Sequence, residues 1–177
     1  MLVFLAVFSR PARAFALAGD PGMQANRFFV LYGMPLLLAG SAGRMLLLGG
    51  EGPPGLFVFL SNLLAFVIAL PAGSWMIARM APSFGSRAGR EEVFKLVVLS
   101  MTPFLLAQVV AGLFPALSWL GYAGLAWALI VYWQGLGPMA GTPRPKATGF
   151  ALVSFFILLG LSWILQLFFA GFIIFAT

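Results

Sequence analysis

The sequence predicts an all-α fold: a polytopic membrane protein with a bundle of five transmembrane helices, preceded by a short N-terminal interfacial amphipathic helix. Hydrophobic residues make up 62% of the 177 residues and charged residues only 8%, whereas an ordinary soluble domain carries about 25% charged residues. The apolar residues form five runs of about 20 residues, the length that crosses a hydrocarbon core. These runs are continuous and do not alternate with polar residues, which excludes a transmembrane β-barrel.

Residues 1–27 are predicted to be the N-terminal interfacial segment. The stretch MLVFLAVF is too short to span a membrane and has no basic residue before it, so we predict no secretory signal peptide. In SRPARAFALAG, Ser9 can cap a short helix and Gly19 can end it. Such a helix leaves Arg10 and Arg13 free to meet phosphates. It either contacts anionic lipid or a partner, or it only anchors the chain in the interface.

Residues 28–177 are predicted to be the transmembrane domain. The expected spans are residues 28–48, 56–78, 93–114, 116–136 and 150–176. Pro115 separates the third span from the fourth, because proline cannot donate the backbone hydrogen bond that a continuing helix needs. We therefore expect these two spans to form a tight hairpin.

The basic residues predict the orientation of the chain. Most of them lie before the first span, around the second connection and in the fourth connection, which all fall on one side of the membrane. They are Arg10, Arg13, Arg27, Arg79, Arg87, Arg90, Lys95, Arg144 and Lys146. The other side has Arg44, followed by Glu51 in the next loop. Because Lys and Arg are retained in the cytoplasm during insertion, we predict a multi-pass protein of the cell (inner) membrane with its N-terminus cytoplasmic and its C-terminus outside.

The fourth connection, GLGPMAGTPRPKATGF at residues 135–150, is predicted to be a cytoplasmic loop. In one interpretation Arg144 and Lys146 contact lipid phosphate or an acidic partner, and the glycines allow close approach. In the other, the prolines and glycines only form a rigid turn, and the two cations set the topology.

Three prolines interrupt spans in the cytoplasmic half of the predicted bundle: Pro35, Pro71 and Pro103. Each frees the carbonyl four residues earlier, and hydrocarbon offers that oxygen no partner. The freed carbonyls belong to Leu31, Val67 and Leu99. In one interpretation they line a cytoplasm-facing polar pocket, to which Ser100 and Thr102 add hydroxyls. In the other, they are kinks whose carbonyls are met by neighbouring hydroxyls or a water.

A second polar group is expected in the other leaflet. Asn62, Gln108 and Gln166 come from three different spans at similar predicted depth. Because amides buried in lipid seek polar partners, we expect interhelical contacts among them. Small residues at helical spacing predict close backbone packing between helices. They are Ala39, Gly40, Gly43, Ala107, Ala111, Gly124 and Ala128.

The composition argues against catalysis. The chain has no His and no Cys, so we expect no metal site, no cofactor and no Ser–His pair for acyl transfer. The four acids, Asp20, Glu51, Glu91 and Glu92, lie outside the expected spans. No buried carboxylate pair is therefore predicted for intramembrane hydrolysis or for a proton relay. The net charge of +6 is explained by topology, and no nucleic-acid partner is expected.

Several small residues and prolines resemble the Yip family, the Ypt/Rab-interacting membrane proteins. They are Arg10 and Pro11 near the start, Thr102 and Pro103 in the third span, Pro115 at its end, and Gly135, Gly141, Pro143, Lys146, Ala147 and Gly149 around the fourth connection. The resemblance implies a five-helix bundle with a cytoplasmic N-terminus. We expect the chain to be similar to bacterial-type members, without the long cytosolic N-terminal region of eukaryotic members. The resemblance therefore gives no reason to expect that this chain binds Rab-type GTPases, as eukaryotic members do.

Two functions are consistent with these features. The first is a noncatalytic integral membrane protein of the Yip type, acting in membrane organisation or in protein and lipid interaction. Its partners would be membrane lipids, another protein or a second copy of the chain. The alternative is a small transporter, channel or lipid-moving protein with a cytoplasm-facing polar groove. An enzyme acting on lipid is disfavoured by the missing histidines and the absence of acids from the spans.

Overall fold

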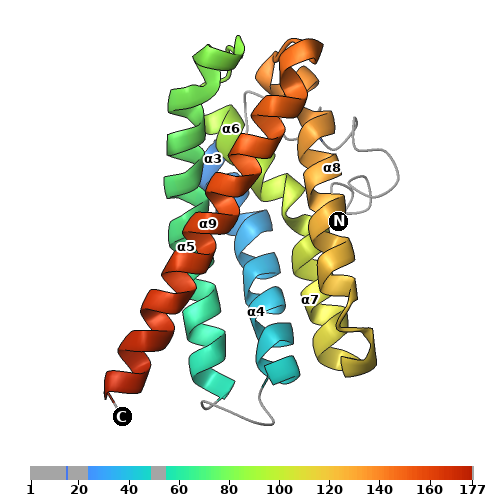
Figure 1. Ribbon diagram of the computed structural model, residues 1–177. Coiled ribbons are helices and arrows are strands. Elements are labelled where there is room, and N and C mark those ends of the chain that lie inside the picture. The colour runs from blue at the N-terminus through green and yellow to red at the C-terminus, as the bar shows by residue number, and fades with distance from the viewer. Residues whose placement is uncertain (1–14, 16–23, 49–54, 177) are drawn as a thin grey trace.

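The computed structural model describes Phe15 and residues 24–48 and 55–176, with side chains except at residues 170 and 172–176. These residues fold into a bundle of long helices and contain no strand (Figure 1). The prediction of an all-α fold is confirmed. The predicted interfacial helix, with Arg10 and Arg13, lies outside the described residues except for Phe15, which is helical and buried. That helix stays a prediction.

The first predicted span is a continuous helical stretch made of three elements. Helix α3 (Ala25–Phe28) leads into a π-helical turn, η1 (Phe29–Gly33), and then into α4 (Met34–Leu48). The backbone N–H at the C-terminal end of η1 bonds the Phe29 carbonyl. Pro35 is the second residue after η1 and has no N–H to give to the preceding turn. A π turn is rare, and in membrane helices it is one of the local adjustments that accommodate a proline.

Helix α5 (Gly55–Met80) carries Pro71 in its interior and continues into a 3₁₀ turn, η2 (Ala81–Phe84). The turn ends at Gly85, whose φ of 72° lies in the left-handed region that favours glycine.

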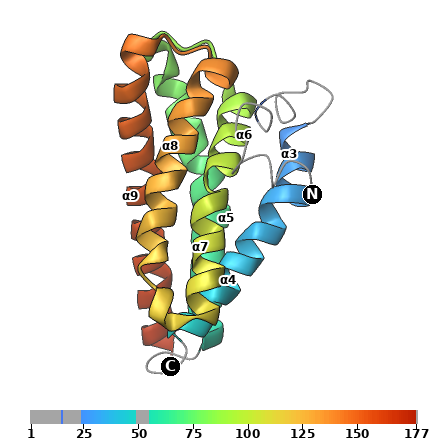
Figure 2. The same ribbon diagram turned by 90° about the vertical axis from the view of Figure 1, so that its right-hand side faces the viewer.

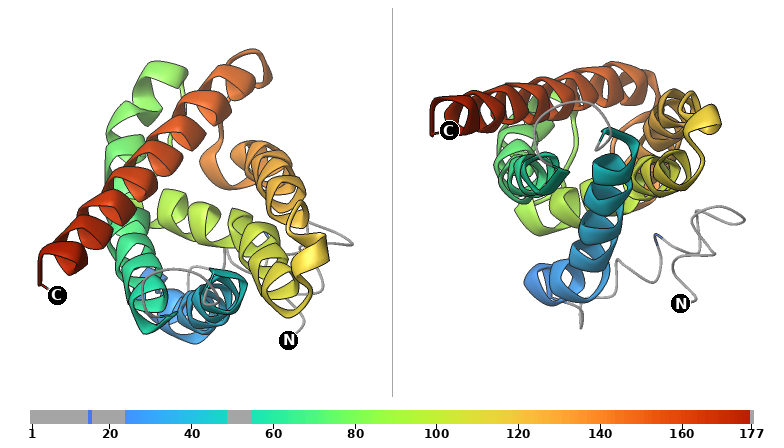
Figure 3. Two further views of the ribbon diagram at one scale, coloured as in Figure 1. Left: turned by 60° about the horizontal axis from the view of Figure 1, so that its bottom comes forward. Right: turned by 90° about the horizontal axis from the view of Figure 1, so that it is seen from below.

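The third predicted span is broken into α6 (Arg90–Ser100) and α7 (Thr102–Leu113). The break is at Met101, because Pro103 in the first turn of α7 cannot donate to the Leu99 carbonyl. All residues from 93 to 103 are buried, and α6 lies among the other helices (Figure 3). Lys95, which we expected in a basic connection, is instead a buried residue of α6 with only 6% of its surface exposed.

The predicted hairpin at Pro115 is confirmed. A 3₁₀ turn, η3 (Pro115–Leu117), joins α7 to α8 (Leu120–Ala140). Helix α8 begins and ends later than the span predicted at residues 116–136, because η3 and the residues after it take up the start of that range.

The predicted loop at residues 135–150 is mostly helical, so its predicted extent was wrong. Only residues 141–143 separate α8 from α9 (Arg144–Ala176). Gly141, with a φ of 58°, ends α8, and the Thr142 N–H bonds the Leu136 carbonyl at 3.1 Å. Pro145 lies in the first turn of α9, where a missing N–H costs no helical bond. The prolines and glycines therefore mark two helix ends within the stretch.

Four helical stretches of the described chain are long and apolar enough to cross a membrane. They are Ala25–Leu48, Gly55–Phe84, Arg90–Leu113 and Arg144–Phe169. Helix α8 is not among them, although it has 21 residues. Its glycines, its tyrosine and tryptophan side chains and Gln134 reduce its mean hydropathy. Four of the five predicted spans meet this criterion, and a crossing by α8 stays a prediction.

Close backbone contacts hold the helices together at small residues. A Cβ atom added to Gly112 of α7 would collide with the backbone of Gly43 in α4. A Cβ atom added to Gly124 of α8 would collide with Ala107 of α7. Gly43, Ala107 and Gly124 were expected at close packing contacts of this kind, whereas Gly112 was not. Large apolar side chains such as Ile68, Phe156 and Trp163 stay exposed on the outside, as in a bundle surrounded by lipid.

Candidate functional site

The helix connections define two ends of the bundle. One end contains the connection from α5 to α6 and the connection from α8 to α9, which run side by side (Figure 2). It is named the basic end, because its exposed residues include five cations. They are Arg79, Arg87, Arg90, Arg144 and Lys146. The opposite end contains the C-terminus of α4, the beginning of α5 and the η3 turn (Figure 1).

Hydrogen bonds join the two connections at the basic end. The Ser86 hydroxyl donates to the Ala140 carbonyl at 2.6 Å, and the Arg87 N–H donates to the same oxygen at 3.2 Å. Phe84 and Phe150 stack beside them with ring centroids 5.0 Å apart. Arg144 and Lys146, the predicted lipid or partner contacts, follow directly in the first turn of α9 and are exposed. Sequence reasoning missed Ser86 as the group that docks the connections.

Pro71 lines two cavities close to the start of α6. One, of about 330 Å³, is lined by Ala25, Asn26, Pro71, Arg90, Glu91 and Phe94. The other, of about 540 Å³, is lined by Val67, Ile68, Pro71, Ala72, Trp75 and Arg90. Val67 is the residue whose carbonyl Pro71 leaves without its helical N–H. Neither cavity is lined by Pro35, which is exposed, or by Pro103, which is buried.

The two predicted pocket hydroxyls make internal bonds. Ser100 donates to the Val97 carbonyl at 2.8 Å, and Thr102 shares a hydrogen bond of 2.9 Å with the Tyr32 hydroxyl. Backbone N–H groups at the C-terminal cap of α6 bond the Val97 and Leu99 carbonyls. The break at Pro103 therefore has local partners, and Pro71 is the predicted pocket residue that lines the two cavities close to the start of α6.

The three predicted amides have different surroundings. Asn62 of α5 donates to the Ser41 hydroxyl of α4 at 3.0 Å, and both residues are buried. Gln108 is buried in α7, and its Oε1 has no hydrogen-bond partner within the described part of the chain. Gln166 is half-buried in α9. The interhelical contact that forms here is thus between Asn62 and Ser41, a serine that the sequence reasoning did not consider.

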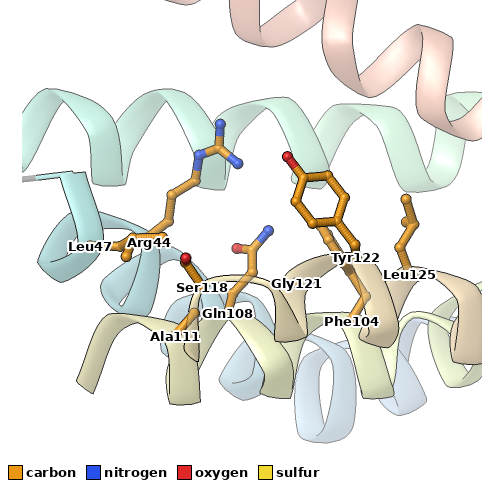
Figure 4. Close-up of a pocket in the computed structure, with 9 residues that line it drawn as sticks. All are labelled: Arg44, Leu47, Phe104, Gln108, Ala111, Ser118, Gly121, Tyr122 and Leu125. Atoms are coloured by element: carbon orange, nitrogen blue, oxygen red, sulfur yellow. The ribbon is translucent and has the colours of Figure 1, made fainter. Parts of the chain in front are cut away.

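A third cavity, of about 320 Å³, lies at the opposite end between α4, α7 and the start of α8. Its lining residues are Arg44, Leu47, Phe104, Gln108, Ala111, Ser118, Gly121, Tyr122 and Leu125. Figure 4 shows the Gln108 amide between the Arg44 guanidinium and the Tyr122 ring. This third cavity is named the Arg44 cavity. From the sequence alone, Arg44 was named only as a basic residue on the opposite side of the membrane. A cation within an apolar run also indicates a functional site, so this signal was missed.

The described residues contain no group of three or more His, Cys, Asp or Glu that would hold a metal ion.

Comparison with known proteins adds one assignment. The model of the Yip1 domain family matches residues 5–166 of the chain. No curated protein matches the sequence, and no solved structure matches it. The family match and the apolar helices agree with an integral membrane protein. The family match covers most of the chain and confirms the resemblance to the Yip family: the chain belongs to the Yip1 domain family.

Proposed function

We propose that the chain is a noncatalytic integral membrane protein of the Yip type that takes part in membrane organisation, through contacts with lipids, a protein partner or a second copy of itself. The observation that carries the proposal is the docking of the two connections through the Ala140 carbonyl. This docking holds Arg87, Arg144 and Lys146 at one end of the bundle. Such a cationic surface attracts lipid phosphates and acidic protein surfaces.

The proposed protein crosses the cell (inner) membrane five times, with the N-terminus cytoplasmic and the C-terminus outside. The fifth crossing is α8, whose 21 residues extend over about 31 Å at about 1.5 Å per residue, close to the thickness of a hydrocarbon core. It runs beside α7 and α9 between the two ends of the bundle (Figures 1 and 2). Exposed Trp119 and Trp133 lie toward its two ends, as interfacial aromatic residues do.

The distribution of ionisable residues supports a noncatalytic role. The chain has no His, and the described acids, Glu91 and Glu92, are exposed in the first turn of α6. General acid–base catalysis needs a group placed against the reacting atoms with its proton affinity tuned by burial or by neighbours. Glu91 also lines the smaller Pro71 cavity, but both carboxylates are exposed at a helix N-terminus, where acids are favourable.

A photoreactive residue at exposed Thr148 of α9 tests the proposal in cells. We expect it to form adducts with anionic lipid or with a protein, and the double variant Arg144→Gln with Lys146→Gln to lose them. A reporter fused to the C-terminus should show unchanged topology, and Arg44→Gln at the opposite end should leave the adducts unchanged. Equal adducts in the wild type and the double variant would contradict a role for this surface.

The second candidate function is a small transporter, channel or lipid-moving protein with a cytoplasm-facing polar groove. The observation that favours it is the pair of cavities that share Pro71 and Arg90. Because the chain has no Cys, single cysteines report access directly. A water-filled groove predicts that Ala72→Cys in the cavity wall reacts with a membrane-impermeant thiol reagent from the cytoplasmic side. Lipid-facing Leu64→Cys is the control, and equal lack of reaction at both positions would exclude an aqueous groove.

A further inference from the structure

We propose that the Arg44 cavity binds the headgroup of a phospholipid that carries both a phosphate and a hydrogen-bond donor, a hydroxyl or an ammonium group. The proposal rests on the membrane location proposed above and adds a second lipid site with a stated chemistry. This site lies at the end of the bundle opposite to the basic end, and no residue of the docked connections lines it.

The cavity is polar near the end of the bundle and apolar farther from it, which matches the two parts of a lipid. Arg44 stands one turn before the end of α4, and Ser118 lies in the turn before α8. Both therefore lie near the end of the bundle, at the level expected for lipid headgroups. Phe104, near the start of α7, and Leu125, inside α8, line the cavity farther from this end. A lipid with its headgroup at Arg44 would place the start of its acyl chain on these two apolar residues.

Arg44 supplies the charge that a phosphate needs. A guanidinium stays protonated and presents several N–H donors in a planar arrangement that matches phosphate oxygens. The described carboxylates, Glu91 and Glu92, stand at the beginning of α6, in the other end of the molecule. Glu51 follows Arg44 in the sequence and lies outside the described residues. An internal ion pair with Glu51 is therefore an explicit alternative for the experiment.

Gln108 supplies the selectivity. Only 7% of its surface is exposed, and its Oε1 has no partner among the described groups. A buried carbonyl oxygen without a hydrogen bond is unfavourable, and a phosphate offers it only further acceptors. A hydroxyl of a glycerol headgroup or the ammonium of an ethanolamine headgroup can donate to this oxygen. A choline headgroup has neither O–H nor N–H, so it leaves Gln108 unsatisfied.

Native mass spectrometry of the full chain with lipid mixtures tests the proposal. The protein is purified in detergent and given equal amounts of phosphatidylglycerol, phosphatidylethanolamine and phosphatidylcholine. We expect phosphatidylglycerol or phosphatidylethanolamine to be retained about fivefold to tenfold more than phosphatidylcholine, the ratio that one added hydrogen bond provides. Equal retention of all three lipids would overturn the proposal.

Substitutions assign this preference to the cavity. Arg44→Gln should lose most of the retained phospholipid, whereas Arg79→Gln, an exposed cation beside Trp75 at the basic end, should not. Gln108→Leu should keep phospholipid but lose the preference among headgroups, and exposed Gln134→Leu is its matched control. If Gln108→Leu fails to fold, Tyr122→Phe replaces it, because Tyr122 is exposed in the cavity wall. Tyr122→Phe removes a hydroxyl from the cavity wall and should also weaken phospholipid retention.

Two further arms separate the alternatives. Glu51→Gln should leave lipid retention unchanged. If Arg44→Gln and Glu51→Gln instead lower thermal stability equally without changing lipid retention, Arg44 serves an ion pair and the proposal fails. Inorganic phosphate in lipid-free detergent should give no bound mass. Phosphate bound under those conditions would assign the site to a soluble anion and contradict a lipid headgroup. None of these outcomes depends on Arg144 or Lys146, so the function proposed above is tested separately.

Discussion

At the residue scale, Gly112 determines how closely α7 approaches α4. A Cβ atom at this position would collide with the Gly43 backbone. We therefore expect Gly112→Ala to lower the free energy of unfolding by about 1–3 kcal/mol, the usual cost of overpacking. Thermal unfolding of the purified protein in one detergent measures the change. The matched control is Gly121→Ala, because a Cβ atom there meets nothing within 4 Å. Equal unfolding midpoints for the two variants would contradict the packing described here.

A second residue-scale prediction concerns the bond between Asn62 and Ser41. A buried interhelical hydrogen bond in a membrane protein contributes about 0.6–2 kcal/mol, and Asn62→Leu should remove this contribution. A double-mutant cycle with Ser41→Ala should show that the two substitutions are not additive, since each removes the same bond. Ser61→Ala is the control, because its hydroxyl bonds Val58 within its own helix at 3.1 Å. Strict additivity of Asn62→Leu and Ser41→Ala would show that the bond does not form.

The predicted residues met in space only where the packing of whole helices brought them together. Depth in a membrane can be counted along a sequence, and it placed Asn62, Gln108 and Gln166 at similar levels. The direction that each side chain faces depends on which helices are neighbours. Arg44 and Gln108 line one cavity because α4 and α7 are in backbone contact at Gly43 and Gly112. Such a pairing is not visible in the apolar runs, so the Arg44 cavity was not predicted.

At the element scale, the docking of the two basic connections can be tested at Ser86. We expect Ser86→Ala to lose about 1 kcal/mol of docking free energy with the hydrogen bond to Ala140. The test uses membrane vesicles with the basic end outward. If separation of the two connections limits cleavage, trypsin should cut after Arg87 about fivefold faster in Ser86→Ala than in the wild type. Exposed Ser83→Ala is the matched control. An unchanged rate of cleavage in Ser86→Ala would mean that the connections are not held by this bond.

Helix boundaries were harder to predict than the existence of the helices. The long apolar runs of α5 and α9 and the turn at Pro115 could be predicted, because each follows from hydropathy or from the missing N–H of proline. The stretch at residues 135–150 looked like a loop because it is rich in Pro and Gly. In the structure Pro138 lies in the last turn of α8 and Pro145 in the first turn of α9. Composition identifies a helix end but not on which side of it a proline lies.

At the scale of the whole molecule, the position of α8 determines the topology of the chain. If α8 crosses the membrane, the number of crossings is odd and the docked connections share one compartment with the N-terminus. If it does not, the connection from α8 to α9 lies in the same compartment as the η3 turn. The mean hydropathy of α8 leaves this open, whereas its length and its place between α7 and α9 favour a crossing.

The most direct test of the five-span bundle uses single cysteines at the two ends of α8. The chain has no Cys, so Ser118→Cys and Pro143→Cys each introduce one thiol at an exposed position. A membrane-impermeant thiol reagent added to intact cells should label Ser118→Cys, and it should label Pro143→Cys only after the membrane is permeabilised. Labelling of both positions from the same side would show that α8 does not cross, and would contradict the five-span bundle.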